Sequence, residues 1–295
     1  MKKTEASQFD LFVTHLTDLP LRDQRDTMER PFFALSKRRT APIEYRVGDL
    51  FVRVSAPSKY GLATIWDADV LIWAASQITD ARNRGKPHGP RLSFMPYDLL
   101  RAIRRGTSGR DYERLRETLR RLTATTVETN VRVPDGGRAA MFHWVERWTE
   151  ETDQAGNSRG MVIELPAWLY EALNEGRVLA VDPAYFDLTS GTARWLYRVV
   201  RKHAGNQDAG WAFTMRQLHD KSGTVQRFSD FARDVRRIVE ANHLPEYHLT
   251  AYEGDRGDEC IHAVRRDRLA VDHEAHDGRM LTERGKRRTR PRIGQ

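Results

Sequence analysis

The sequence predicts an α+β protein that consists of two tandem winged-helix domains, and three observations support this prediction. An arginine-rich amphipathic helix begins near Ser108 and runs directly into a β-branched, strand-like segment. The same succession of helix, short strand, helix, helix, strand and strand recurs in the second half of the chain. The 49 Lys and Arg residues exceed the 41 Asp and Glu residues and give a formal net charge of +8, which favours a phosphate-bearing partner.

The segment 107–130 predicts a DNA recognition helix. Ser108 is a suitable N-cap, and Asp111 stands three residues later, where a carboxylate can accept from free amides at the helix start. Apolar residues then recur at spacings of three and four, and these are Tyr112, Leu115, Leu119 and Leu122. Eight arginines lie between positions 101 and 121 against three acidic residues, an imbalance that costs self-repulsion unless a polyanion neutralises it. An ordinary solvated helix face is the alternative interpretation.

The other elements of the first domain follow from local patterns. Residues 1–30 are polar and charged with few core residues, so we expect a flexible or loosely helical leader. Alternating, β-branched residues predict two short strands around positions 48–49. The remaining expected elements are a helix at 67–83, a strand at 91–95, a helix at 96–105, a hairpin of strands 125–133 and 139–148 around the turn 134–137, and a strand at 161–165.

The second domain repeats this order. We expect a helix at 192–203, a strand at 211–213 and a helix that Thr214 and Gln217 begin as a capping box and Gly223 ends. A second amphipathic helix at 225–242 places apolar residues behind arginines, and strands at 247–252 and 260–265 follow it. Because the whole order of elements recurs, a duplicated winged-helix unit is the simplest interpretation.

Composition also predicts the domain boundaries and the cellular compartment. We expect the leader at 1–30, the N-terminal winged-helix domain at 31–165, the C-terminal winged-helix domain at 166–270 and a basic, disordered tail at 271–295. The tail is either a solubilising extension or a nonspecific phosphate contact. The single cysteine, Cys260, excludes an intramolecular disulfide, and no apolar run is long enough for a membrane span or a signal peptide. The sequence therefore predicts a cytoplasmic protein.

Candidate DNA contacts in the first domain lie on its arginine-rich helix and beside its hairpin turn. Arg110 and Arg114 stand one turn apart near the helix start, where bidentate pairing with guanine reads a base. Arg120 and Arg121 lie further along and are expected to contact phosphate. The predicted set for this domain is Ser108, Arg110, Arg114, Arg120, Arg121 and, flanking the hairpin turn, Arg132 and Arg138.

Candidate contacts in the second domain surround the helix at 225–242. Gln226 is a candidate reader of adenine, because an amide can pair with two atoms of that base. The turn before this helix carries small polar and basic side chains that suit the phosphate backbone. The predicted set for this domain is Lys221, Ser222, Thr224, Gln226, Arg227, Arg233, Arg236 and Arg237.

Four segments of the chain resemble the plasmid replication initiator proteins of the replication initiator protein A type. They are PFFALSKRRTAPIEY, YGLATIWDADVLIW, SFMPYDLLRAI and TSGRDYERLRETLRRLTATTVETN, and they fall within residues 31–130. The resemblance implies a bacterial protein with a pair of winged helices and no catalytic centre of its own. It also implies binding to direct repeats (iterons) at a plasmid origin, help in opening an adjacent A·T-rich stretch, recruitment of a host helicase or initiator, and an equilibrium between monomer and dimer.

The residues themselves leave two other functions open. No GxxxxGK spacing and no His–apolar–His pair occurs, so we expect no ATP hydrolysis, no rolling-circle chemistry, no cofactor and no enzyme activity. A winged-helix transcriptional repressor would use the same DNA-binding surface without a role in replication. A DNA nuclease or relaxase would need a site that includes Tyr112 or the acid pair Asp67 and Asp69, although acids are also common at a helix start. Cys260 and His262, with His248 on a facing strand, are too few to predict a metal site.

Overall fold

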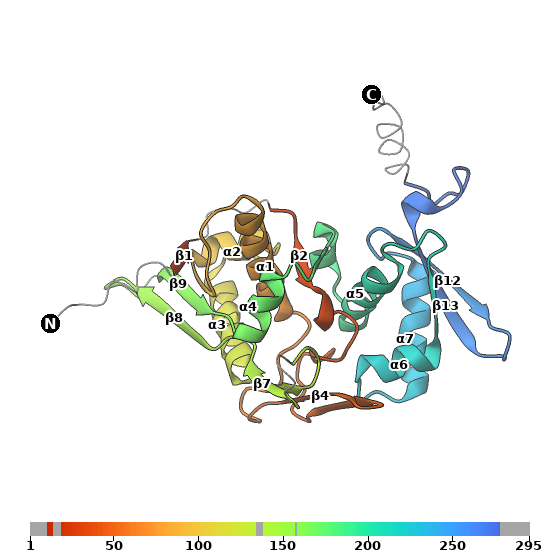
Figure 1. Cartoon of the computed structure of the whole chain (residues 1–295), viewed down its shortest axis with the longest axis horizontal. Coiled ribbons are helices and arrows are strands. Elements are labelled where there is room, and N and C mark those ends of the chain that lie inside the picture. Colours follow the sequence, from red (N-terminus) through yellow and green to blue (C-terminus); the bar gives the residue numbers. More distant parts are fainter. Residues whose placement is uncertain (1–10, 14–18, 134–137, 157, 278–295) are drawn as a thin grey trace, which may run out of the picture.

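The computed structural model describes residues 11–13, 19–133, 138–156 and 158–277. These residues form seven α-helices and four small sheets, so the chain has the mixed α and β structure that the sequence predicts. Figure 1 shows the elements of residues 68–164, the first unit, at the left and those of residues 191–265, the second unit, at the right. Residues 1–10 and 14–18 of the predicted leader, the hairpin turn 134–137 and residues 278–295 of the predicted tail lie outside the described residues.

The first unit places a three-stranded antiparallel arrangement beside three helices. Ser108 caps the third helix as expected, because its N–H and hydroxyl both donate to the Asp111 carboxylate, at 3.1 and 2.6 Å. Strand β5 pairs with β9, which pairs with β8, and β1 (Leu11–Val13) runs parallel to β5 on its other edge. The elements are α1 (Ala68–Asn83), β5 (Arg91–Phe94), α2 (Pro96–Ala102), α3 (Gly109–Ala124), β8 (Arg147–Thr152) and β9 (Ser158–Glu164).

The hairpin that the sequence predicts after α3 forms, but it belongs to a different sheet. Its strands β6 (Thr126–Thr129) and β7 (Ala140–His143) pair with each other, and β6 also pairs with β4 (Leu50–Ser55), which pairs with β3 (Ile43–Val47). The hairpin attached to β5 is instead β8–β9. An alternating pattern specifies which face of a strand is buried, but it does not specify the neighbouring strand. The pairing of β3 with β4 around positions 48–49 is confirmed.

The second unit repeats the strand arrangement of the first. Its sheet has the order β11-β13-β12, which corresponds to β5-β9-β8, and Thr214 and Gln217 form the expected capping box. Gly223 ends the second helix of this unit with a φ of +58°, and a Cβ there would meet the Pro31 side chain at 2.4 Å, so this turn requires glycine. The elements are α5 (Gly191–Ala204), β11 (Trp211–Thr214), α6 (Met215–Ser222), α7 (Phe228–Ala241), β12 (Tyr247–Glu253) and β13 (Glu259–Arg265).

The segment between the units and the end of the predicted leader are folded together. Strand β2 (Arg22–Gln24) pairs with β10 (Val178–Ala180), which follows α4 (Ala167–Asn174). Leu21 and Met28 are buried, so residues 21–28 form part of the fold, and the prediction of a flexible leader over these residues is wrong. This segment has few apolar residues, so its sequence does not look like part of a core. Its acidic residues are nevertheless buried, because they contact arginines that are distant in the chain.

Helix α5 joins the two units through buried ion pairs. Arg194 Nη1 lies 2.6 Å from Asp69 Oδ1 on α1, and Arg198 Nε lies 2.6 Å from Asp23 Oδ2 on β2. Arg198 also donates to the Thr27 hydroxyl at 2.8 Å. Buried apolar side chains of both units belong to one continuous cluster. The second unit is therefore docked firmly on the first.

A further ionic cluster centres on Glu29. Its carboxylate lies 2.8 Å from Lys202 Nζ and 2.9 Å from His203 Nε2, both near the end of α5. Burial opposes ionisation, but the hydrogen bonds from His203 and Lys202 outweigh it and hold the pKa of Glu29 well below its ordinary value. The junction between the units is thus made of compensated charges as well as apolar contacts.

We predict that the Asp23–Arg198 pair is strongly coupled. Arg198→Met should lower the free energy of unfolding by about 3–5 kcal/mol, because it leaves a buried carboxylate without its partner. The combined variant Asp23→Leu/Arg198→Met should lose much less, and urea denaturation of the single and double variants measures the difference. Arg53→Ala, which removes an exposed pair with Glu44, is the control, with an expected loss below about 1 kcal/mol. Additive losses in the double variant would contradict the coupling.

Candidate nucleic-acid interface

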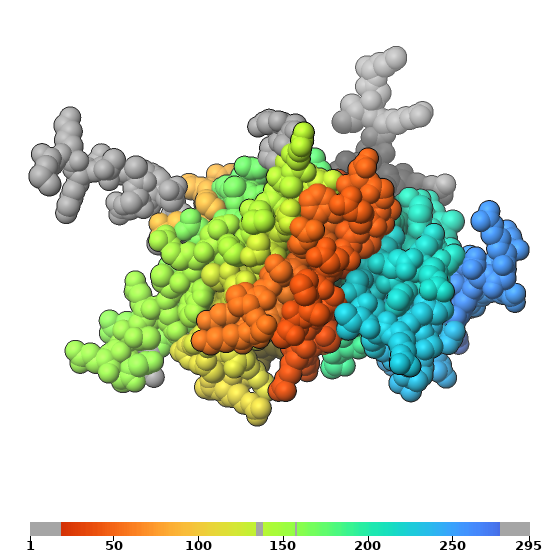
Figure 2. Space-filling model, turned by 90° about the horizontal axis from the view of Figure 1, so that it is seen from below, coloured from red at the N-terminus to blue at the C-terminus, as the bar shows by residue number. Residues whose placement is uncertain are grey.

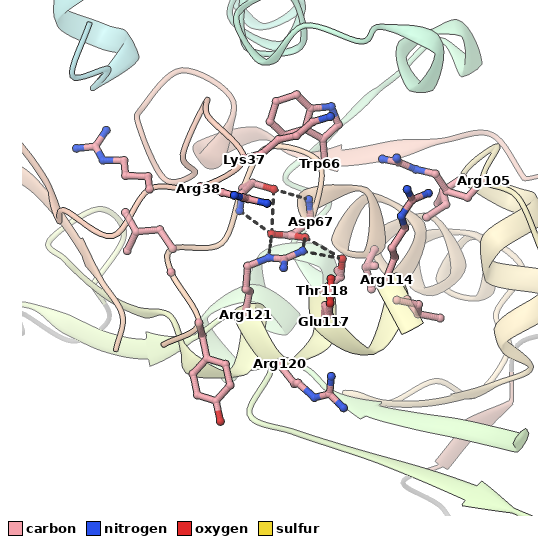
Figure 3. Close-up of a pocket in the computed structure, with 18 of the residues that line it drawn as sticks. Lys37, Arg38, Trp66, Asp67, Arg105, Arg114, Glu117, Thr118, Arg120 and Arg121 are labelled. Atoms are coloured by element: carbon pink, nitrogen blue, oxygen red, sulfur yellow. Dashed lines mark hydrogen bonds and ion pairs between the residues drawn. The ribbon is translucent and has the colours of Figure 1, made fainter. Parts of the chain in front are cut away.

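A groove of about 1200 Å³ runs along one side of α3. Helix α3 lines one side of it, residues 37–40 and 58–62, here called the far wall, also line it, and Phe186, Leu188 and Thr189 contribute as well. Figure 3 shows Lys37, Arg38 and Trp66 on one side of this space and Arg114 and Arg121 on the other. Figure 2 shows that the red and orange part of the chain, which includes these loops, lies between the first unit and the cyan helices of the second.

The groove is strongly cationic. Nine basic side chains line it against three carboxylates, so its electrostatic potential is positive before any partner is bound. The basic residues are Lys37, Arg38, Arg39, Lys59, Arg105, Arg114, Arg120, Arg121 and Arg194, and the acidic residues are Asp67, Asp111 and Glu117.

Three of the predicted arginines on α3 are available to a partner. Arg110 is exposed and has no hydrogen bond or ion pair with any residue that the structure describes. Arg114 is 60% exposed and lies 3.2 Å from Asp111, and Arg120 is 43% exposed and lies 2.8 Å from Glu113. Surface ion pairs of this kind contribute about 0–1 kcal/mol, so a phosphate or a base can replace the carboxylate at little cost.

Arg121 has a structural role, which corrects its prediction as a phosphate contact. Its Nε and Nη2 donate to the Asp67 carboxylate at 2.9 and 2.7 Å, and Asp67 also accepts from the Thr118 hydroxyl at 2.8 Å. The hydrogen bonds to Asp67 raise the pKa of Arg121. Figure 3 shows this network at the floor of the groove. The Nε and Nη2 donors of the guanidinium thus join α3 to the start of α1.

The contacts predicted beside the first hairpin turn also change. Arg132 lies over the Trp168 ring at 4.6 Å and lies 3.7 Å from Asp26, so it packs inside the protein and is not available at a hairpin tip. Burial lowers the pKa of Arg132. Arg138 is exposed, but the turn beside it is not described. In the β8–β9 hairpin next to β5, Glu150 binds Arg116 on α3 at 2.8 Å, and Glu151 is exposed.

Helix α7 presents arginines at its start and along its exposed side. Arg227 is the N-cap of the helix, and its side chain has no hydrogen bond or ion pair with the described part of the chain. Arg233 lies 2.8 Å from Asp230, and Arg237 is 70% exposed and 3.9 Å from Asp234. Arg236 is held by two hydrogen bonds to Glu259 on β13, at 2.8 and 2.7 Å, so it supports the hairpin. Gln226 is exposed and donates to Asp234 at 3.0 Å.

The turn between α6 and α7 is only partly available. Ser222 is 1% exposed, and its hydroxyl donates to the His219 carbonyl at 2.7 Å and accepts from the Thr224 N–H at 3.1 Å. Ser222 therefore stabilises the turn and cannot contact phosphate as predicted. Thr224 accepts from the Gln226 N–H at 3.2 Å. Lys221 lies 4.0 Å from Glu29, toward the junction of the two units.

Sequence reasoning missed the far wall of the groove. Lys37, Arg38 and Lys59 lie far from α3 in the chain, and the run of three basic residues at 37–39 was the one local signal. Arg105 also lines the groove, where its Nη2 lies 2.6 Å from Asp69.

The acid pair that a nuclease would use is neutralised by arginines. Asp67 binds Arg121, and Asp69 binds Arg105 and Arg194. Within the described ranges, no group of three or more His, Cys, Asp or Glu residues is placed to hold a metal ion. No helix among the described residues is both long and apolar enough to cross a membrane.

Comparison with known proteins gives a consistent result. The family model of replication initiator protein A matches residues 22–249. A "Putative replication protein" of Wigglesworthia glossinidia brevipalpis is 31% identical over 232 residues, which cover 77% of this chain and 84% of that protein. Two crystal structures of domains 2 and 3 of RctB share the fold. They have TM-scores of 0.58 and 0.53, at 13% and 12% identity, and cover 80% and 79% of this chain and 96% and 94% of those chains. The chain belongs to the replication initiator protein A family.

Proposed function

We propose that this replication initiator binds the repeats of a plasmid origin through two winged-helix units, with α3 and α7 as the recognition helices. The observation that carries the proposal is the duplicated topology, in which the third helix of each unit presents exposed arginines. In winged-helix and helix-turn-helix proteins this helix enters the major groove. The continuous core and the buried ion pairs of α5 fix the two helices relative to each other, which simultaneous binding of both helices to one duplex requires.

The arginines that stay exposed define how the repeat is read. Arg110 and Arg114 lie on the first half of α3, and Arg227 lies at the start of α7, where side chains reach base edges. A bidentate arginine–guanine pair discriminates against another base by about 1–3 kcal/mol. Arg120, Arg233 and Arg237 are assigned to the phosphate backbone, where they fix position without reading sequence.

In this proposal, binding to the repeats leads to the later steps of initiation. Occupied repeats would assist opening of an adjacent A·T-rich stretch and bring in a host helicase or initiator, and the chain itself would catalyse no reaction. Family membership supports these steps. The monomer–dimer equilibrium stays a prediction.

We predict regular protection of origin DNA by the full chain. Footprinting on the region flanking its gene should show protected segments that repeat at about two helical turns, since each protein carries two recognition helices. The affinity should fall by about 10³–10⁵ between 50 and 200 mM salt if six to ten phosphates are contacted. Protection of a single palindrome in the promoter would indicate a transcriptional repressor. Metal-dependent nicking lost in Asp67→Asn or Tyr112→Phe would indicate a nuclease.

We predict different effects for two arginines of α3. Arg114→Ala should relax the preference at one or two base positions of the repeat, because it removes a base contact. Arg120→Ala should weaken binding to all duplexes evenly, because it removes a phosphate contact. Competition binding with single-base variants of the repeat measures both effects, with the exposed Arg84→Ala as control. If Arg114→Ala instead weakened binding to all duplexes equally, Arg114 would be a phosphate contact and not a base contact.

A further inference from the structure

We propose that Lys37, Arg38 and Lys59, here named the cationic wall, form a second contact with the backbone of the DNA duplex that α3 reads. This inference rests on the proposed function. The three side chains line the same groove as the arginines of α3, on loops that local sequence patterns do not connect to DNA binding. The groove would hold one sugar–phosphate strand between the cationic wall and the arginines of α3.

The cationic wall carries charges that the protein leaves uncompensated. Lys37, Arg38 and Lys59 are exposed, and none of them forms a hydrogen bond or an ion pair with a residue in the described ranges. Two of them instead contact aromatic rings, because the Lys37 ammonium lies 5.4 Å from the Trp66 ring centre and the Lys59 ammonium lies 5.4 Å from that of Tyr60. These contacts hold the cations in place without neutralising them.

Arg39 shows how the loop is held. Its guanidinium donates to the Ala41 and Pro42 carbonyls at 2.9 and 2.7 Å, and it also donates to the carbonyl of Gly223 in the turn between α6 and α7. The third cation of the run thus anchors the loop to itself and to the second unit. Lys37 and Arg38 stay available at the groove as a consequence.

The position of the groove favours a duplex backbone. An α-helix with side chains is about 10–12 Å wide and fills a major groove of about 12 Å, so a sugar–phosphate strand runs along each side of an inserted helix. The groove lies along one side of α3, where such a strand would run. Lysine is a flexible point charge, so these contacts should add affinity and not sequence preference.

The test compares two full-length variants that lose the same charge. The first is Lys37→Ala/Arg38→Ala/Lys59→Ala. The control is Arg25→Ala/Arg82→Ala/Lys86→Ala, which removes three exposed cations that do not line the groove. Dissociation constants are measured from 50 to 200 mM salt for a repeat duplex, a scrambled duplex and a single strand. Thermal unfolding confirms that each variant is folded, and Lys59→Ala alone provides a milder substitution.

We expect the cationic-wall variant to show a weaker salt dependence than the control. Each lost phosphate contact lowers the slope of log K against log salt by about 0.9, so three contacts lower it by about 2.7. The wild type should then lose about 40-fold more affinity than the variant across this fourfold salt range. Lys59→Ala should lower the slope by about 0.9. The preference for the repeat over the scrambled duplex should not change.

Three other results are distinguishable. A slope equal to that of the control overturns the cationic wall as a duplex contact, while repeat binding by the wild type preserves the proposed function. A loss confined to the single strand also overturns the inference, because the groove would then take unpaired DNA. Failure of the wild type to prefer its repeats at any salt concentration overturns the proposed function itself.

Discussion

The structure depends on two arginines of the first helix of the second unit, which are buried against acids on α1 and β2. Arg194 and Arg198 stand one turn apart on α5 and bind Asp69 and Asp23. Removing such charges from water is costly, so the pairs hold only where both partners are placed accurately. That requirement fixes α5 on α1 and β2, and the second unit follows because α5 is its first helix. The relative position of α3 and α7 is therefore set by these pairs together with the continuous apolar core.

The same residue type performs opposite tasks in this protein. Arg121, Arg194 and Arg198 are used inside the protein, where the planar guanidinium satisfies two or three acceptors at once. Arg110 and Arg227 stay exposed without a carboxylate partner from the described residues. The net charge of the chain therefore overstates how many arginines can meet DNA, because several of them are used to hold the fold together.

Much of the fold could be predicted because its signals are local. The caps at Ser108 and Thr214, the amphipathic faces of α3 and α7 and the turn at Gly223 depend on residues within a few positions of one another. The sheet to which each hairpin belongs could not be predicted, because β4 and β6 are neighbours only in space. The role of Arg121 was hidden for the same reason, since its partner Asp67 lies 54 residues away. The far wall of the groove, at Lys37 and Lys59, likewise exists only after folding.

The most direct test of the account locates α3 and α7 on DNA. An iron chelate is attached at Glu117→Cys on α3 or at Ser229→Cys on α7, both exposed positions, in a Cys260→Ser background. Hydroxyl radicals then cut the repeat duplex near the label. The account predicts two cleavage centres within one repeat, about one helical turn apart, in agreement with two recognition helices in successive major grooves. Cleavage from only one position, or from centres with no fixed spacing, would contradict it.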